Sequence, residues 1–204
     1  MLNLMSEDAQ CMQRAIELAL LAEQEGNLPV GAVISLGGRV VAEGRSAIWV
    51  PEFDASRHAE MEALRAVPKD LWESSDEMSL YTTLEPCLMC FGSILLHRVG
   101  RVVFGSSDTY GGASSVLLHL PPYFRERIEK TQWLGPVMES ECDPLCRRLM
   151  ALVEARQGQA GREDTRPVVK RTQPLGAYRV VWQPPVRKLL AIGDSRQRLA
   201  SSAG

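Results

Sequence analysis

The chain is predicted to fold as a layered α/β domain around a mixed sheet. An apolar hairpin follows the first helical segment, and strands then alternate with helical segments without an internal repeat. Alternation of strands and helices is typical of parallel strand pairs whose faces are covered by helices, while the hairpin contributes an antiparallel pair. The order of elements therefore predicts a sheet that contains both kinds of pairing.

Each expected element follows from a local pattern. Apolar residues three or four positions apart predict helices, and short apolar runs bounded by Gly or Pro predict strands. Gly37 and Gly38 supply a tight turn, and Pro68 ends a helix. Residues 105–122, which contain two glycines and two prolines, predict a loop. In order, we expect a helix over 8–25, strands over 30–36 and 39–43, a helix over 58–67, a strand over 78–84, a helix over 87–97, a strand over 101–104, a short strand starting at Val137 and a helix over 141–156.

Length and composition exclude several classes of protein. The 204 residues suffice for one ordinary domain with an extension, and 45% hydrophobic with 24% charged residues is close to the globular average. These values exclude a disordered or collagen-like chain. No apolar run approaches the ~20 residues of a membrane span, and the N-terminus lacks the pattern of a secretory signal. We therefore expect a cytoplasmic protein without a membrane partner.

Charge is divided unevenly along the chain. Residues 158–204 hold nine Lys and Arg against three acids, a net charge of +6, which leaves −8 for residues 1–157 of the total of −2. The helical period also disappears from about Gly158, where Gln, Gly, Arg and Pro dominate. This change predicts one folded domain over 1–157 and a basic C-terminal extension over 158–204. We expect the extension to be flexible or lightly docked, and the alternative is that 178–182 form one strand of an accessory hairpin.

Two short motifs carry the candidate chemistry. His58 stands at the start of one expected helix, and Cys87 and Cys90 stand at the start of another. Two thiolates three positions apart at a helix N-terminus point the same way, and the helix dipole favours their charged form. One imidazole and two thiolates suit Zn²⁺ and leave its fourth tetrahedral position to water. Without the histidine motif, the cysteines would equally well be core thiols or a redox pair.

Glu60 follows the histidine by two positions and cannot share its direction on a helix. We expect its carboxylate beside the metal rather than on it, where it would carry a proton from the zinc-bound water to a ring nitrogen and a leaving amine. A metal-activated water and a proton shuttle together replace an aromatic amino group by oxygen. The His-x-Glu and Pro-Cys-x-x-Cys pattern is the known signature of zinc deaminases.

These motifs extend into a wider resemblance over roughly residues 9–150. The chain resembles the zinc-dependent cytidine/deoxycytidylate deaminase superfamily, and within it the bacterial tRNA adenosine deaminase and nucleobase (guanine-type) deaminase branch. The sequence segments that carry this resemblance include residues 29–33, 58–60, 83–90 and 98–105. The resemblance implies a three-layer fold with a central mixed five-stranded sheet flanked by helices. It also implies one zinc ion per chain on His58, Cys87 and Cys90, catalysis by Glu60, and a homodimer.

The departures from the tRNA branch concern the substrate. Ser46 stands where that branch has an Asn that contacts the base, Phe91 replaces a small residue, and Tyr110 replaces a Lys. The last helix lacks the Phe-Phe pair and the basic residues that help to hold the anticodon loop. The candidate substrate-binding residues are Val30, Ser46, Ala59, Leu84, Pro86, Phe91 and Asp108.

Several functions stay open at this point. The main hypothesis is a hydrolytic deaminase of a free nucleobase or nucleoside, with a purine favoured. The alternative is conversion of adenosine to inosine at the wobble position of the tRNA anticodon loop, for which the basic extension would supply phosphate contacts. A deaminase-like binding subunit is disfavoured by the presence of Glu60, and a structural zinc module by the lack of a fourth ligand. Cys142 and Cys146 are expected to pack in the core.

Overall fold

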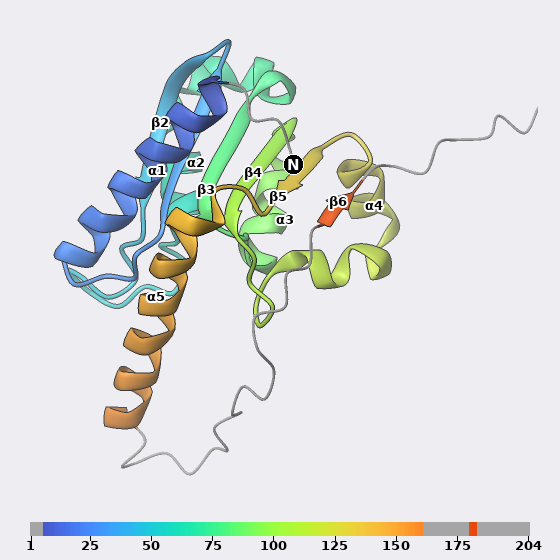
Figure 1. The fold of residues 1–204 in the computed structure, drawn as a ribbon. Coiled ribbons are helices and arrows are strands. Elements are labelled where there is room, and N and C mark those ends of the chain that lie inside the picture. The colour runs from blue at the N-terminus through green and yellow to red at the C-terminus, as the bar shows by residue number, and fades with distance from the viewer. Residues whose placement is uncertain (1–5, 161–179, 183–204) are drawn as a thin grey trace, which may run out of the picture.

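A computed structural model describes residues 6–160 and 180–182 of the chain. Within these residues, six strands form one sheet with helices on both of its faces (Figure 1). The elements are α1 (Ser6–Gln24), β1 (Gly31–Leu36), β2 (Arg39–Arg45), α2 (Ala59–Ala66), the 3₁₀ segment η1 (Lys69–Glu77), β3 (Ser79–Leu84), α3 (Leu88–Leu96), β4 (Arg101–Ser106), the 3₁₀ segment η2 (Ala113–His119), α4 (Pro122–Ile128), β5 (Gln132–Gly135), α5 (Glu139–Ala160) and β6 (Val180–Trp182).

The sheet is mixed, as the order of elements predicts. Its strands lie in the order β2-β1-β3-β4-β5-β6. Strand β1 is antiparallel to both β2 and β3, whereas β3, β4 and β5 are mutually parallel neighbours. The parallel strands are joined by helical crossovers, which explains why helices cover the sheet there. The carboxyl ends of β3 and β4 therefore open toward the same edge of the sheet.

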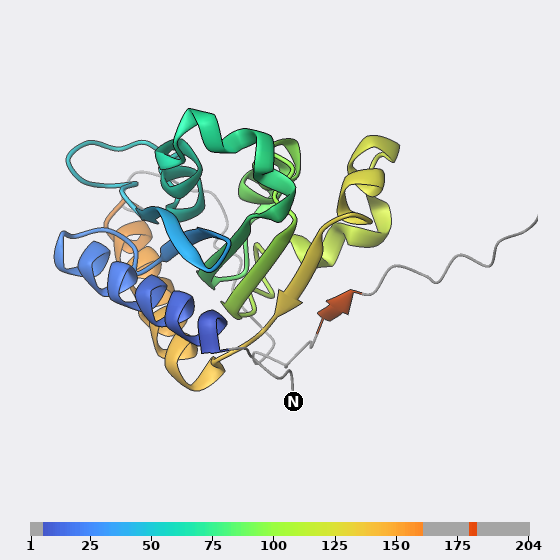
Figure 2. The same ribbon diagram turned by 90° about the horizontal axis from the view of Figure 1, so that it is seen from above.

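The helices divide into two layers (Figure 2). Helices α1 and α5 cover one face, where Met12, Tyr81 and Leu145 are buried in one apolar cluster. Helices α2 and α3 cover the other face, where Leu80 and Ile94 belong to a larger cluster. Successive residues of β3 thus point to opposite faces, because side chains alternate along a strand. The three-layer α/β architecture of the prediction is confirmed.

The structure departs from the expected elements in three places. The last central strand is β5 over Gln132–Gly135, not a strand starting at Val137. Residues 105–122, expected to be a loop, contain the 3₁₀ segment η2 and lead into α4, which has Pro122 in its first turn. Proline is well tolerated there because the first helical N–H groups have no partner within the helix. A sixth strand, β6, adds antiparallel to β5, so residues 180–182 extend the central sheet rather than an accessory hairpin.

Among the described residues, no helix combines the length and the apolar character that crossing a membrane requires. The residues around β6 in the predicted extension lie outside the described part of the chain.

Candidate metal centre and substrate cavity

The predicted site residues gather at one edge of the sheet. Strands β2, β3 and β4 end there, and helices α2 and α3 begin there. Gly44 near the end of β2 lets α2 approach closely, because a Cβ at this position would collide with the backbone of Ala59 and Ala63. Close contact of α2 with the sheet fixes the N-terminus of this helix beside the carboxyl end of β3. Ligand sites of open α/β sheets commonly lie at such an edge.

Both helix N-termini carry potential metal ligands. His58 is the N-cap residue of α2, Cys87 is the N-cap residue of α3, and Cys90 lies in the first turn of α3. Their ligating atoms all lie within 4.8 Å of one another, and His58 Nδ1 is 3.6 Å from Cys87 Sγ. Ligands at about 2.1 Å (His N) and 2.3 Å (Cys S) that subtend a tetrahedral angle would be about 3.6 Å apart. His58 and Cys87 therefore have the separation expected of two ligands on one tetrahedral zinc ion, and Cys90 lies within reach of the same position.

The two thiols differ in how readily they lose a proton, as metal binding requires. The pKa of the Cys87 thiol is lowered to about 4, first because the Cys90 thiol donates a hydrogen bond to it and then because His58 lies beside it. The pKa of the Cys90 thiol is raised, because the thiol donates a hydrogen bond to the Cys87 sulfur and because Cys90 is buried. The hydrogen bond to Cys87 raises the pKa of the His58 imidazole. Because metal ligands must be deprotonated, metal binding at this cluster would release protons.

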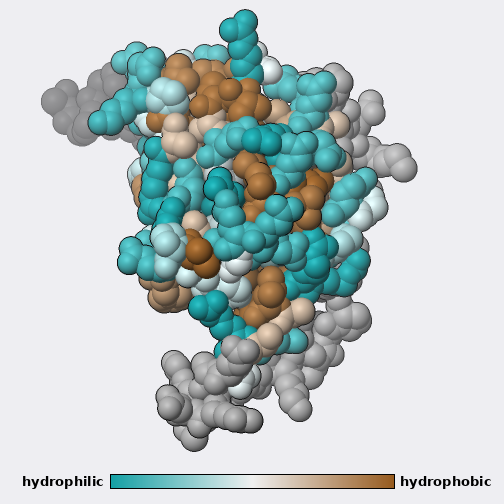
Figure 3. Space-filling view, turned by 90° about the vertical axis from the view of Figure 1, so that its left-hand side faces the viewer, coloured by the Kyte–Doolittle hydropathy of each residue, from teal (hydrophilic) through white to brown (hydrophobic). Residues whose placement is uncertain are grey.

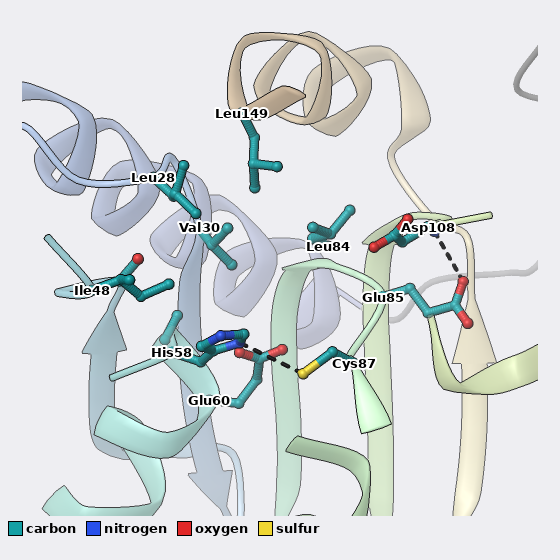
Figure 4. Close-up of a pocket in the computed structure, with 12 residues that line it drawn as sticks. Leu28, Val30, Ile48, His58, Glu60, Leu84, Glu85, Cys87, Asp108 and Leu149 are labelled. Atoms are coloured by element: carbon teal, nitrogen blue, oxygen red, sulfur yellow. Dashed lines mark hydrogen bonds between the residues drawn. The ribbon is translucent and has the colours of Figure 1, made fainter. Parts of the chain in front are cut away.

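Glu60 lies beside the three ligands but outside their group (Figure 4). It sits in the first turn of α2 with 3% of its surface exposed. Burial raises the pKa of the Glu60 carboxyl above its ordinary value, and the nearby His58 opposes this shift. A carboxyl whose pKa lies above its ordinary value is a better proton acceptor than an exposed carboxylate.

A cavity of about 150 Å³ opens next to this cluster. Its walls are mainly apolar, and Figure 4 shows Leu149 of α5 across the cavity from His58 and Glu60. The residues that line it are Leu28, Val30, Ser46, Ile48, His58, Ala59, Glu60, Leu84, Glu85, Cys87, Asp108 and Leu149. A small apolar cavity with a few polar groups beside a metal cluster is typical of a site for a small aromatic substrate.

The structure brings most of the candidate substrate-binding residues to this cavity. Val30, Ser46, Ala59, Leu84 and Asp108 line it. Pro86 and Phe91 do not: the Phe91 ring is 3% exposed and packs edge-to-face on Trp133, with ring centroids 5.3 Å apart.

Four lining residues were not anticipated from the sequence. Leu28, Ile48 and Leu149 come from segments whose sequence carries no motif, and only the fold brings them together. Glu85 was recognisable, because it lies between the strand β3 and the ligand Cys87. Its carboxylate accepts hydrogen bonds from the backbone N–H groups of Asp108 at 3.0 Å and Ser114 at 2.8 Å.

The remaining cysteines form no second centre in the part of the chain that the structure describes. Cys142 and Cys146 are buried, and among the described residues His58, Cys87 and Cys90 are the only group of three potential ligands. Burial raises the pKa of the Cys142 thiol to about 12, so this thiol stays protonated and unreactive. Both side chains pack in the core, as the sequence predicts.

Comparison with known proteins identifies close likenesses. The family described as the cytidine and deoxycytidylate deaminase zinc-binding region matches residues 5–106. The chain is 37% identical over 141 residues to a tRNA-specific adenosine deaminase of Bacillus subtilis, covering 68% of this chain and 85% of that protein. It is 41% identical over 114 residues to that of Haemophilus influenzae, covering 55% and 65%. A solved structure from a study of A-to-I editing by tRNA:A34 deaminases at the wobble position of transfer RNA is also similar, with 27% identity, a TM-score of 0.56, and coverage of 67% of this chain and 99% of that one.

Proposed function

The chain belongs to the cytidine and deoxycytidylate deaminase zinc-binding family, and from this membership we propose that it deaminates a nucleobase held in the cavity beside His58, Cys87 and Cys90. Family membership makes the chain a zinc-dependent hydrolytic deaminase, which replaces a ring amino group by oxygen and releases ammonia. The observation that supports the proposed site is that His58, Cys87 and the buried carboxyl of Glu60 line one small cavity, while Cys90 completes the group of three possible metal ligands.

The proposal gives each residue of the centre one task. His58, Cys87 and Cys90 would hold one zinc ion, and three protein ligands leave a tetrahedral position open to water. Zinc, when bound, lowers the pKa of its water to about 7 and so supplies the nucleophile. Glu60 would take one proton of that water and pass it to a ring nitrogen, and it would then carry the second proton to the leaving amine. The net reaction consumes one water and yields one ammonia.

The cavity suits a flat heteroaromatic ring. Leu28, Val30, Ile48 and Leu149 offer apolar contacts to the ring faces, and polar groups are fewer. A purine or pyrimidine has this distribution, with apolar faces and a polar edge.

Ser46 is the candidate reader of the polar edge. This residue is 1% exposed, and its Oγ has no hydrogen-bond partner among the residues that the structure describes. A buried hydroxyl without a partner is costly, so such a group points to a ligand that pairs with it. We infer that the Ser46 hydroxyl hydrogen-bonds a ring substituent or ring nitrogen of the substrate.

The charges around the cavity favour a neutral ligand. No Lys or Arg is among the residues that line it. Arg45, Arg57 and Arg148, each next to a lining residue in the sequence, form ion pairs with glutamates at 2.7, 2.9 and 2.7 Å. Figure 3 shows the face of the molecule on which α1 lies, which is the left-hand side of Figure 1. This face is mostly hydrophilic and has scattered apolar patches. Because these cations already have anionic partners, a free base or nucleoside is the preferred substrate, with a purine favoured.

The second candidate is the wobble adenosine of tRNA. Its support is the names of the relatives, which are tRNA-specific adenosine deaminases, and the net charge of +6 in residues 158–204. Such an extension would supply the phosphate contacts that the residues lining the cavity lack.

Three further features belong to the proposal. Residues 1–157 would form the catalytic domain, and 158–204 a basic extension. The chain would act as a homodimer, with exposed apolar residues such as Leu88 and Met89 at the start of α3 available to a second copy. The chain would act in the cytoplasm, as the sequence predicts.

The test is ammonia release by zinc-loaded full-length chain against guanine, adenine, cytosine, their nucleosides, and a tRNA with adenosine at the wobble position. Turnover of a free base or nucleoside supports the preferred substrate. Inosine formed only in tRNA, with binding that weakens as salt rises, would establish the second candidate instead. No ammonia from any substrate in the panel would contradict both.

A further inference from the structure

One buried carboxylate beside the metal cluster has no task in the proposed reaction. Glu85 is 6% exposed and lies two residues before the ligand Cys87. Its Oε2 accepts the backbone N–H of Asp108 at 3.0 Å, and its Oε1 accepts the backbone N–H of Ser114 at 2.8 Å. Figure 4 shows the Glu85 carboxylate turned toward Asp108 and away from His58 and Glu60. Both carboxylate oxygens therefore hold backbone rather than facing the cluster.

The two bonded N–H groups belong to opposite ends of one segment, which we call the 107–114 loop. This loop follows β4, carries Asp108 into the cavity lining and leads into η2. Its middle is ordered by the Asp108 carboxylate, whose Oδ1 accepts the N–H groups of Tyr110 at 2.9 Å and Gly111 at 3.0 Å. Glu85 thus closes the loop from outside, while Asp108 orders it from within.

Further contacts join this loop to the segment that carries the metal ligand. The N–H of Ala113 donates to the carbonyl of Pro86 at 3.0 Å, and Gly112 pairs with Cys87 in an isolated antiparallel bridge. Gly112 leaves no room beside Glu85, because a Cβ on it would collide with the Glu85 carboxylate and with the carbonyl of Asp108. The carboxylate therefore fits against bare backbone, at a fixed place relative to Cys87.

We propose that Glu85 is a positioning residue, which holds the 107–114 loop, and with it Asp108, against the substrate cavity at a fixed distance from the metal ligands. This inference rests on the proposed function, since it takes the cavity to be the substrate site. Charge-assisted hydrogen bonds from backbone N–H groups to a carboxylate are strong, so the buried pair of bonds sets the loop conformation before substrate binds. Glu85 itself transfers no proton and binds no metal.

The decisive variant is Glu85→Gln. A carboxamide has one oxygen to accept from one N–H, and its own NH₂ group then faces the other donor, so one end of the loop is released. We expect the zinc content per chain to stay at the wild-type value and kcat to change less than about threefold. KM should rise about tenfold, the equivalent of one lost hydrogen bond to a charged group. Amide hydrogen exchange in 107–114 should become faster, while exchange in α2 stays unchanged.

Two further variants make the result specific. Glu126→Gln removes an exposed carboxylate from α4 and should leave zinc content, KM and exchange at their wild-type values. Gly112→Ala places a Cβ against both the Glu85 carboxylate and the Asp108 carbonyl, at a backbone conformation that alanine itself adopts freely (φ −69°, ψ 142°). It should reproduce the rise in KM even where Glu85→Gln fails to fold.

The outcomes separate this inference from the proposed function. Wild-type turnover in the same assay tests the function, and zinc content and amide exchange report on Glu85 without any substrate. A loss of zinc, a fall in kcat at unchanged KM, or unchanged exchange in 107–114 would overturn the positioning role. Faster exchange with unchanged KM would also overturn it, because the loop would then be held for stability alone.

Discussion

Replacing Ser46 by alanine should have opposite effects on stability and on catalysis. In the unliganded protein the Ser46 hydroxyl is buried, and no protein group hydrogen-bonds it. A buried polar group without a partner costs about 1–3 kcal/mol, and Ser46→Ala removes that cost together with a single oxygen atom. The backbone N–H of Ser46 donates to the carbonyl of Val30 at 2.9 Å, and alanine keeps that bond.

The expected gain is about 1 kcal/mol in the free energy of unfolding of the unliganded protein. For a domain of this size, 1 kcal/mol raises Tm by about 2–4 °C. The same variant should lower kcat/KM about tenfold, because a tenfold change in rate corresponds to ~1.4 kcal/mol, the value of one hydrogen bond to the substrate. A variant that is more stable but less active is typical of a site whose polar groups have no partner until a ligand binds.

Thr82→Val is the matched control. The Thr82 Oγ1 is also buried without a partner, in β3, but Thr82 does not line the cavity. This change should raise Tm by a similar amount and leave kcat/KM at the wild-type value. Thermal unfolding without substrate and steady-state kinetics on the same preparations measure both effects. A lower Tm for Ser46→Ala, or an unchanged kcat/KM, would refute the assignment of Ser46 to the substrate.

Two further predictions concern the fold. Asp8 is 2% exposed and accepts hydrogen bonds from Arg101 at 2.6 and 3.0 Å and from the Tyr81 hydroxyl at 2.9 Å. Asp8→Asn should cost about 3 kcal/mol, because it leaves the Arg101 charge without its partner, and urea unfolding against the exposed control Asp70→Asn measures this loss. The Arg57 guanidinium holds the pKa of the Glu62 carboxyl below its ordinary value near 4.5. The stability that this ion pair contributes is therefore present above pH ~4.5 and is lost as the pH falls further. Glu62→Gln should make Tm depend less on pH in this acidic range. An unchanged dependence of Tm on pH would count against the ion pair.

The metal centre was the most predictable part of the molecule. Its candidate ligands belong to two short motifs, and each motif stands at the start of a helix that the local sequence predicts. Proximity of Cys87 and Cys90 is set within one helical turn, so no tertiary information is needed for two of the three ligands. Only the proximity of His58 to the two cysteines depends on the fold. The spacing in the sequence does not predict that proximity, and the resemblance to a known family does.

The substrate cavity was less predictable, because its walls come from distant segments. Leu149 reaches it from α5 and Ile48 from the loop after β2, and neither position differs in sequence from an ordinary core residue. Phe91 shows the converse. It follows a metal ligand directly, yet the helical turn carries its ring away from the cavity and onto Trp133. Direction on a helix, rather than distance along the chain, decides which neighbours of a motif face the substrate.

One error in the predicted fold concerns proline, which occurs both after the ends of helices and in their first turns. Proline ends helices but also begins them, and Pro122 starts α4 in a segment that was expected to be a loop. The strand expected from Val137 lies a few residues earlier, where Trp133 and Leu134 pair with β4. Short strands are defined by their neighbours in the sheet, and a sequence of four residues does not record that pairing.

The central claim is that Glu60 moves the proton in a zinc-dependent hydrolytic deamination. The most direct measurement is ammonia release by zinc-loaded wild-type chain and by Glu60→Gln, with the zinc content of both determined beforehand. We expect the two proteins to have equal zinc content and the wild type to release one ammonia for each product molecule. The rate of ammonia release by Glu60→Gln should be lower by about 10²-fold or more. Equal rates for the two proteins at equal zinc content would contradict it.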